Sequence, residues 1–274
     1  MVIRPCRSST RRDLSRYDRR VTEHPDLGSF LSSTLEARQI LSIGREHPLD
    51  IHVSPAGADT TVVVFHAALT DSCTPLPIFA GASMLKPLDV NLVQVADPGL
   101  YADDGLTIGW FAGSAHHPVQ RELVTVLEKV FDELGGSRRV FFGASAGGFA
   151  ALYYGSSFPG SSVVCVNPQT ILSNFTREHQ EDYCLKAWGA PPEQVWGKSV
   201  DADLRETFDG VNHNDVLYVQ NVRDPHVQLH MEPFLASIPD DRVQVLRGDW
   251  GEGHQAPSSS ELSRMLSQVV SPSG

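Results

Sequence analysis

The 274-residue sequence predicts an α/β protein in which a mostly parallel, doubly wound sheet is flanked by helices. The first observation is that short β-branched runs alternate with stretches of helical periodicity, which is the pattern of repeated strand–helix units. The second is that several of these runs are apolar without interruption, as expected for strands buried on both faces of a parallel sheet. A hydrophobic content of 41% is enough for one large domain.

The first half of the expected domain contains four strands and one long helix. Each strand-like run is apolar or β-branched and is bounded by turn residues. These runs cover residues 39–44, 49–54, 60–67 and 90–97. The helix is expected over 118–136, because apolar residues recur there at helical spacing, Pro118 stands near the start and Gly135 follows the last apolar position.

The second half continues to alternate strands and helices. Strands are expected at 138–145, 161–168, 214–221 and 242–248, and helices at 146–158, 227–238 and 258–270. The insert at 169–210 separates two strands by more than one helix requires. It contains the aromatic residues Phe175, Tyr183, Trp188 and Trp196. We expect this insert to form a short helical cap whose aromatic side chains either shape a pocket or pack against the domain.

Residues 1–35 precede the domain, which we place at 36–274. Seven arginines fall within residues 1–20, and no apolar stretch follows them, so the segment lacks the pattern of an export signal. It also lacks periodic apolar character. We therefore expect a basic arm that is solvated or loosely docked, and we expect the protein to stay active when residues 1–20 are deleted.

Composition and charge argue against several classes of function. A net charge of −11 disfavours nucleic acid as a partner, because phosphate contacts need clustered Lys and Arg. No run approaches the ~18 apolar residues of a membrane span. No dinucleotide or P-loop motif and no metal-ligand spacing occurs, so we expect neither cofactor nor metal. The scattered cysteines predict free thiols in a reducing cytoplasm. They are Cys6, Cys73, Cys165 and Cys184.

The stretch "FFGASAGGFAALYYG" places one serine, Ser145, at a strand-to-helix corner between residues that are only Gly or Ala. G-x-S-x-G in this context is typical of a nucleophile elbow, where a strained turn lifts the serine oxygen clear of the sheet. Gly143 and Gly147 would have to lack side chains because strand and helix crowd together there. The helix N-terminus behind Ser145 supplies N–H groups for a developing oxyanion.

A serine nucleophile needs a base and an acid, and both follow in order after later strands. Asp224 stands in the loop after the strand at 214–221, and His254 stands in a Gly-rich loop after the strand at 242–248. Asp249, in the same loop as His254, is the alternative acid. His226 is too near Asp224 in sequence to be the base, so we expect a structural or peripheral role for it.

The oxyanion hole should also use the loop after the strand at 60–67. The Gly-rich HGGG of many lipases is absent there. We therefore expect the backbone N–H of Ala67 or Ala68 to act together with that of Ala146. A structural role under the site is expected for His66. Further candidates for substrate contact are His66 itself, Trp110 and Trp188.

With Gly143–Gly147, Asp224 and His254 in this order, the chain from about residue 39 onward resembles the α/β-hydrolase superfamily. The middle stretch, from "LTIGWFAGS" to "SSVVCVNPQ", is similar to a branch of accessory-secretion and glycan acyl-transfer proteins. The resemblance implies an α/β-hydrolase fold and a serine hydrolase that cleaves a small-molecule or glycan carboxylic ester through an acyl-enzyme. Acyl transfer to a sugar by the same triad, and a catalytically silent binding protein, remain the alternatives.

Overall fold

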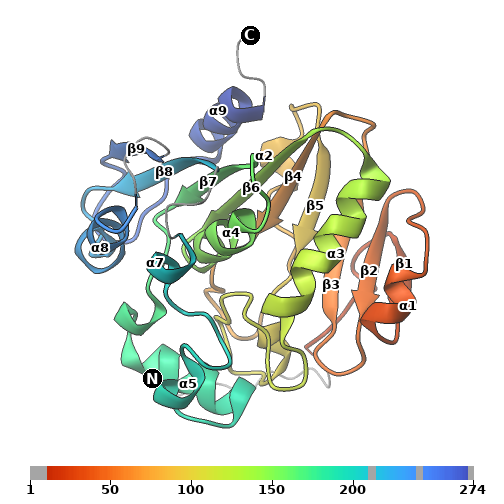
Figure 1. Ribbon diagram of the computed structural model, residues 1–274, viewed down its shortest axis with the longest axis horizontal. Coiled ribbons are helices and arrows are strands. Elements are labelled where there is room, and N and C mark those ends of the chain that lie inside the picture. The colour runs from red at the N-terminus through yellow and green to blue at the C-terminus, as the bar shows by residue number, and fades with distance from the viewer. Residues whose placement is uncertain (1–10, 209–213, 239–242, 271–274) are drawn as a thin grey trace.

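The computed structural model describes residues 11–208, 214–238 and 243–270. Within these ranges, nine strands form one sheet in the order β1-β2-β3-β5-β4-β6-β7-β8-β9 (Figure 1). The strands are β1 (Arg20–His24), β2 (Gln39–Ile43), β3 (Leu49–Ser54), β4 (Thr60–Phe65), β5 (Asn91–Val95), β6 (Arg138–Ala144), β7 (Ser162–Val166), β8 (Asp215–Asn221) and β9 (Val243–Gly248).

All neighbouring pairs in this sheet are parallel except the two that include β3. β3 runs antiparallel to β2 because the short connection at 44–48 cannot make the crossover that parallel strands require. The predicted mostly parallel sheet is confirmed. The six strands from β4 to β9 all run in one direction, so their carboxyl ends meet at the same edge of the sheet.

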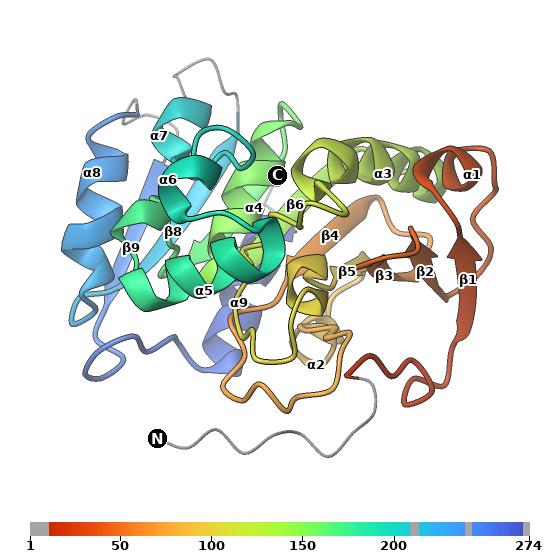
Figure 2. The ribbon, with the colours of Figure 1, turned by 90° about the horizontal axis from the view of Figure 1, so that it is seen from below.

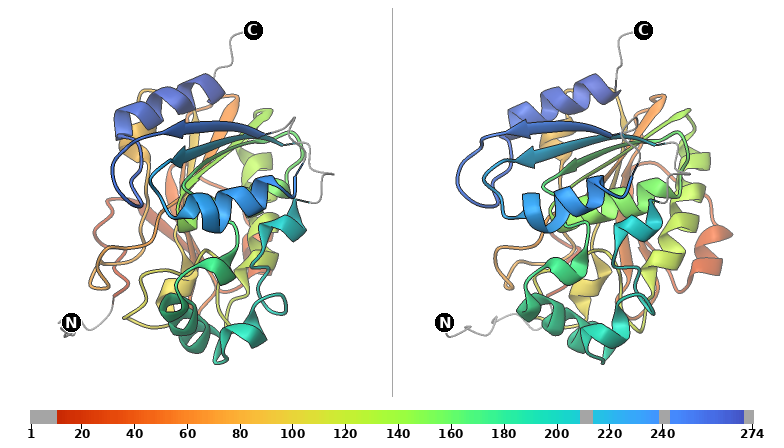
Figure 3. Two further views of the ribbon diagram at one scale, coloured as in Figure 1. Left: turned by 90° about the vertical axis from the view of Figure 1, so that its left-hand side faces the viewer. Right: turned by 60° about the vertical axis from the view of Figure 1, so that its left-hand side comes forward.

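Helices cover both faces of the sheet, as predicted (Figure 3). They are α1 (Leu27–Leu31), α2 (Ala82–Leu85), α3 (Val119–Leu134), α4 (Ala146–Ser156), α5 (Arg177–Trp188), α6 (Pro192–Val195), α7 (Leu204–Thr207), α8 (Glu232–Leu235) and α9 (Ser259–Val270). Apolar residues of α2 and α9 pack on one face, whereas those of α3, α4 and α8 pack on the other.

The helix expected over 227–238 forms in two pieces. A π-helical turn at Val227–Met231 leads directly into α8. Pro233 interrupts the regular pattern because it has no N–H to donate to the preceding turn. The carbonyl oxygen of Leu229, which such a bond would use, accepts a hydrogen bond from Asn174 in the insert.

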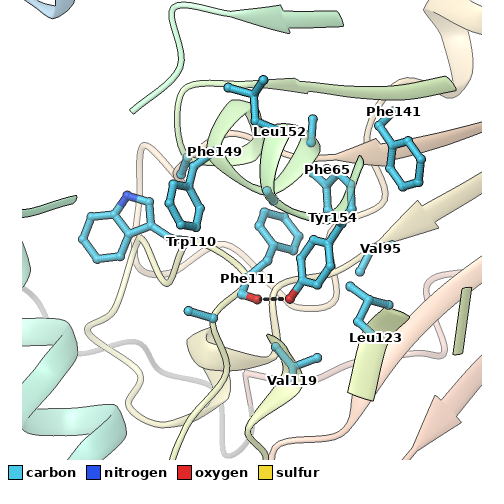
Figure 4. Close-up of a cluster of buried hydrophobic side chains, with 14 of the residues drawn as sticks. Phe65, Val95, Trp110, Phe111, Val119, Leu123, Phe141, Phe149, Leu152 and Tyr154 are labelled. Atoms are coloured by element: carbon cyan, nitrogen blue, oxygen red, sulfur yellow. Dashed lines mark hydrogen bonds between the residues drawn. The ribbon is translucent and has the colours of Figure 1, made fainter. Parts of the chain in front are cut away.

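The larger hydrophobic cluster surrounds α4, whose residues are buried almost all round. Figure 4 shows Phe65, Phe149 and Tyr154 packed beside Trp110 and Phe111. The hydroxyl of Tyr154 donates a hydrogen bond of 2.7 Å to the carbonyl oxygen of Phe111. This bond fastens the loop that contains Trp110 and Phe111 to α4.

The insert after β7 carries α5, α6 and α7, which confirms the predicted short helical insert (Figure 2). Three of its aromatic rings meet the indole of Trp110 edge-on. Their ring centres lie at 5.9 Å (Phe175), 5.4 Å (Tyr183) and 6.0 Å (Trp196) from that of Trp110. Cap and domain are therefore joined through an aromatic cluster.

Residues 11–35 belong to the fold, contrary to the predicted loosely docked arm. β1 adds a parallel strand beside β2, and Phe30 of α1 is fully buried. Arg11 is buried and donates to the carbonyl oxygens of Leu100 and Leu106. Arginine-rich sequence suggests solvation, but a guanidinium can be buried where acceptors surround it. Residues 1–10 lie outside the described residues.

The cysteines differ from the predicted set of free thiols. Cys165 and Cys184 are free and buried, and burial raises the pKa of the Cys184 thiol to about 12. Cys73 is disulfide-bonded, so the prediction is wrong at this position. Cys6 lies outside the described residues. The cytoplasmic location was predicted from four free thiols, and Cys73 does not support it.

None of the helices in the described ranges combines the length and apolar character needed to cross a membrane.

Candidate active site

Ser145 occupies a strained turn between β6 and α4. Its backbone has φ 56° and ψ −117°, a left-handed conformation that a residue with a side chain rarely adopts. The turn is held on both sides, because the N–H of Ser145 donates to the carbonyl oxygen of Val166 and its carbonyl oxygen accepts from Phe149. The sharp reversal of chain direction predicted for a nucleophile elbow is therefore present.

The flanking glycines are required by contact distances. A Cβ atom on Gly143 would overlap the backbone of Gly147, and one on Gly147 would overlap the carbonyl oxygen of Phe65 at the end of β4. Strand β6 and helix α4 thus approach as closely as the sequence predicts. Ala substitutions at either glycine would push the serine turn away from the sheet.

Asp224 and His254 are brought together at the same edge of the sheet. Nδ1 of His254 lies 2.5 Å from Oδ2 of Asp224. The Asp224 side chain is fully buried, whereas that of His254 is 41% exposed. Burial opposes ionisation of Asp224, but the hydrogen bonds from His254 and from the N–H of His226 outweigh it and lower the pKa of the carboxyl. The pair thus combines a buried, ionised acid with an accessible imidazole.

Two asparagines that the sequence analysis missed hold the His254 loop in place. The Asn221 amide donates to the carbonyl oxygens of Gly251 and Gly253, at 2.8 and 2.7 Å. The Asn167 amide donates to the carbonyl oxygen of Gln255 at 2.8 Å. Gly251 and Gly253 have φ of 115° and 76°, which explains why glycine stands there. Both asparagines lie at strand ends, which is the signal that could have identified them.

Asp249, the alternative acid, pairs with Arg223. Its carboxylate pairs with the guanidinium of Arg223 at 2.8 Å, and both side chains are about half exposed. The backbone N–H of Gly251 donates to its other oxygen. The geometry therefore favours Asp224 as the partner of His254.

His226 is buried between two other imidazoles. Its ring centre lies 4.3 Å from that of His254 and 4.6 Å from that of His230. Its Nδ1 faces the carbonyl oxygen of Asn167 at 3.3 Å. Burial and the nearby His254 lower the pKa of His226. His226 is thus buried against His254, and a structural role for it stays a prediction.

Asp224, His226 and His254 place one ligand-type atom each within 4.8 Å of one another, a convergence that sequence spacing did not predict. Both histidines already use Nδ1 in a hydrogen bond. Nδ1 of His254 is joined to Asp224, and Nδ1 of His226 faces Asn167. The arrangement suits proton transfer at His254, and metal ligation through either Nδ1 would break its present hydrogen bond.

The predicted oxyanion donors lie at the same edge. Ala67 is exposed and Ala68 half-buried, and within the described ranges the N–H of neither is used in a hydrogen bond. Ala146 is the first residue of α4, where a helix leaves its N–H groups without internal partners. These three groups are available in the structure, although their role remains a prediction.

Two of the three predicted substrate contacts, His66 and Trp110, are buried, and Trp188 is half-buried. His66 is buried, with Nδ1 facing the carbonyl oxygen of Ala67 at 2.7 Å and Nε2 accepting the N–H of Asp97. Burial lowers the pKa of His66 to about 4. Trp110 is fully buried, and the indole N–H of Trp188 donates to the hydroxyl of Tyr183. The structure thus supports the structural role predicted for His66, and neither His66 nor Trp110 offers an open surface.

Gln169, three residues beyond β7, contacts the serine directly. Its Nε2 lies 3.1 Å from Oγ of Ser145, and its backbone N–H donates to the Ser145 carbonyl oxygen at 3.3 Å. No hydrogen bond joins Ser145 Oγ to His254 in the structure. Gln169 was not predicted as a site residue, although its place just after a strand end could have identified it.

The sequence matches no protein-family model and no curated protein. Solved structures do match. The capsule O-acetyltransferase of Neisseria meningitidis serogroup A superposes with a TM-score of 0.64 at 12% identity, covering 88% of this chain and 98% of that one. The fluorophosphonate-binding serine hydrolase FphF of Staphylococcus aureus gives 0.58 at 12% identity, covering 86% and 100%. An S-formylglutathione hydrolase from Agrobacterium tumefaciens gives 0.55 at 17% identity, covering 87% and 98%.

These similarities and the sheet topology show that the chain has the α/β-hydrolase fold, as the sequence resemblance implied.

Proposed function

We propose that this protein is a serine hydrolase that cleaves a carboxylic ester through an acyl-enzyme on Ser145. The observation that carries the proposal is the bond between Asp224 and His254. A buried carboxylate holds one nitrogen of a half-exposed imidazole, at the sheet edge where Ser145 stands in a strained turn. A carboxylate held this way fixes the tautomer of the imidazole, so the other nitrogen is free to accept a proton.

In the proposed reaction, Ser145 Oγ attacks the ester carbonyl while its proton passes to His254. The carbonyl oxygen becomes an oxyanion, which the N–H groups of Ala146 and of Ala67 or Ala68 stabilise. The bond to the alcohol then breaks, and His254 returns the proton to the departing alcohol oxygen. Water attacks the acyl-enzyme by the same steps, with Oγ as the leaving group.

Acyl transfer to a sugar hydroxyl is the second candidate. Three matching structures are of a capsule O-acetyltransferase, with TM-scores from 0.62 to 0.64. Transfer and hydrolysis share the acyl-enzyme and differ only in whether a hydroxyl compound or water takes the acyl group. The substrate is in either case a small-molecule or glycan ester.

Covalent labelling tests the nucleophile. A fluorophosphonate should modify the wild-type protein at neutral pH, and peptide mass spectrometry should place the adduct on Ser145. Ser145→Ala should remain folded and unlabelled. An unlabelled wild-type protein would favour the catalytically silent binding protein instead.

Product analysis separates hydrolysis from transfer. The protein is incubated with an activated acetyl ester, with and without a polyol, and products are identified by mass spectrometry. Free acetate in both incubations supports hydrolysis. An acetylated polyol that is absent with Ser145→Ala supports transfer.

A further inference from the structure

The side-chain amide of Gln169 is fixed in one orientation by its two neighbours. Its oxygen accepts the indole N–H of Trp110 at 2.5 Å, and its nitrogen faces Ser145 Oγ at 3.1 Å. An indole N–H can only donate, so the amide oxygen must face Trp110. The NH₂ group therefore faces the serine, and Gln169 acts as a donor to Oγ.

Trp110 is itself held rigidly. It and Phe111 have φ of 51° and 56°, two successive left-handed residues with side chains. Asp97 accepts the N–H of Phe111 at 3.1 Å, and Tyr154 donates to the Phe111 carbonyl oxygen at 2.7 Å. The cap rings described above enclose the indole. A strained loop that is fastened at several points indicates that the position of Trp110 is functionally constrained.

An N–H donor beside Ser145 Oγ can assist the reaction because the negative charge on that oxygen changes during it. Oγ becomes most negative as its proton leaves for His254, before its bond to the carbonyl carbon is complete. It becomes negative again when the acyl-enzyme breaks down and Oγ departs. A buried N–H beside Oγ stabilises both transition states more than the neutral hydroxyl, which is the condition for catalysis. Gln169 is 1% exposed, so water does not weaken this interaction.

From this geometry we infer that Gln169 is a catalytic residue of the Ser145 reaction, an N–H donor to the nucleophile oxygen that Trp110 keeps in the donating orientation. This inference rests on the proposed role of Ser145. It adds to the site a donor that acts on the attacking and leaving oxygen, separate from the backbone donors that face the carbonyl oxygen. It also connects the cap to the nucleophile through Trp110.

The chain offers a matched control for this donor. Gln180 in α5 is also buried, and its amide oxygen accepts the indole N–H of Trp196 at 3.1 Å. Its nitrogen donates to the carbonyl oxygens of Ser173 and Phe175, and not to Ser145. Gln169→Met and Gln180→Met each leave one indole N–H without its acceptor, but only the first removes a donor from Oγ.

The experiment compares the second-order rate of fluorophosphonate labelling for the wild-type protein, Gln169→Met, Gln180→Met and Trp110→Phe. Circular dichroism first establishes that each variant is folded, and melting temperatures are expected to fall for all three. We expect labelling on the order of 100-fold slower in Gln169→Met, as for loss of one oxyanion donor. We expect a change of less than about threefold in Gln180→Met, because the rate of labelling is set by groups that contact Ser145.

Trp110→Phe tests the orientation. Without the indole N–H the amide can turn its oxygen toward Ser145, so labelling should slow by about tenfold, a smaller loss than in Gln169→Met. Adding Trp110→Phe to Gln169→Met should change the rate little further, because the donor is already absent. With p-nitrophenyl acetate as substrate, Gln169→Met should lower kcat and leave KM within about twofold.

The possible outcomes separate the two proposals. A wild-type protein that is not labelled at Ser145 overturns the proposed nucleophile. If the wild type is labelled and Gln169→Met reacts as fast as Gln180→Met, the donor role of Gln169 is wrong. If the losses in Trp110→Phe and Gln169→Met add in the double variant, Trp110 does not act through Gln169, which also contradicts the inference.

Discussion

The loops that follow β5 and β8 each bury an aspartate at the same edge of the sheet, and each aspartate has a histidine beside it. Asp97 and Asp224 are equally buried, at 3% exposure. Burial raises the pKa of Asp97 to about 6, against the effect of backbone N–H donors from Phe111, Gly99 and Gly109. The pKa of Asp224 is instead lowered. Asp97 has backbone donors alone, whereas Asp224 also accepts from an imidazole, and this partner contributes to the opposite shift.

The two aspartates differ in which of their atoms forms the hydrogen bond to the neighbouring histidine. His254 offers a ring nitrogen to the carboxylate of Asp224, whereas His66 accepts the backbone N–H of Asp97 and leaves its carboxylate to backbone donors. Both ring nitrogens of His66 are occupied and its environment is buried, so it cannot accept a proton. An adjacent Asp and His therefore form a proton-transfer pair only where the imidazole meets the carboxylate and keeps its other nitrogen accessible.

The largest effect is expected from changing Asp224, the acid of the proposed triad. Asp224→Asn keeps the shape of the side chain but replaces the acceptor of the His254 N–H, so the imidazole loses its fixed tautomer. In serine proteases the equivalent change lowers turnover by about 10⁴. We expect a loss of the same order in p-nitrophenyl acetate turnover, measured on protein shown to be folded by circular dichroism.

A third buried carboxylate, Asp50 in β3, extends the comparison of buried aspartates, because its partner is an arginine. Arg12 binds Asp50, which is fully buried and also accepts the hydroxyl of Tyr101 at 2.5 Å. Arg12→Ala would leave the carboxylate buried without its cation and should lower the free energy of unfolding by about 3 kcal/mol. Urea denaturation measures this loss.

The exposed pair of Arg223 with Asp249 is the matched control for Arg12. Arg223→Ala should change the free energy of unfolding by less than about 1 kcal/mol, because water screens the pair. Equal effects of the two arginine changes would mean that the buried pair of Arg12 with Asp50 contributes no more than an exposed one. This prediction replaces the sequence-based expectation that residues 1–20 are dispensable.

Asp97 predicts a pH dependence of stability with a definite sign. A folded-state pKa of about 6, above the ordinary value of 3.8, means that the folded protein binds a proton that the unfolded chain releases. Its contribution to stability is present below pH 3.8 and is lost as the pH rises through about 6. The unfolding free energy of wild type relative to Asp97→Asn should therefore fall by about 2 kcal/mol between pH 4 and pH 7.

Urea denaturation of both proteins at several pH values measures this difference, because contributions from all other groups cancel. Asp97→Asn itself should be less stable at every pH, since an amide nitrogen cannot accept the N–H of Gly99 or Phe111. A relative stability that does not vary with pH would show that Asp97 titrates normally.

The smallest effect is expected at Asp249, which shares a loop with His254 but pairs with Arg223. Asp249→Asn should lower esterase turnover by tenfold or less, through the loop alone. A greater loss than that of Asp224→Asn would make Asp249 the acid and reverse the comparison between the loops.

Periodicity and composition predicted most of the sheet, because uninterrupted apolar strands have few alternatives to a parallel arrangement. The elbow at Ser145 was predictable from its glycines, and Asp224 and His254 from their order at strand ends. β1 was not predicted, since its residues Arg20–His24 alternate without strong apolar character and gain their place from pairing with β2. The contacts of Gln169, Asn167 and Asn221 were not predicted, because single amide side chains form no recognisable sequence motif. Their partners lie far away in sequence and meet them only in the folded structure.

The way Asn221 and Asn167 fasten the His254 loop has a consequence for how activity returns after denaturation. The loop depends on residues at the ends of β7 and β8, and Ser145 depends on β6 and β4. These contacts span most of the chain, and such long-range contacts form late in folding. If Ser145 is the proposed nucleophile, recovery of fluorophosphonate labelling during refolding should therefore lag behind recovery of the far-ultraviolet circular dichroism signal. Labelling of Ser145 would then report completed sheet assembly.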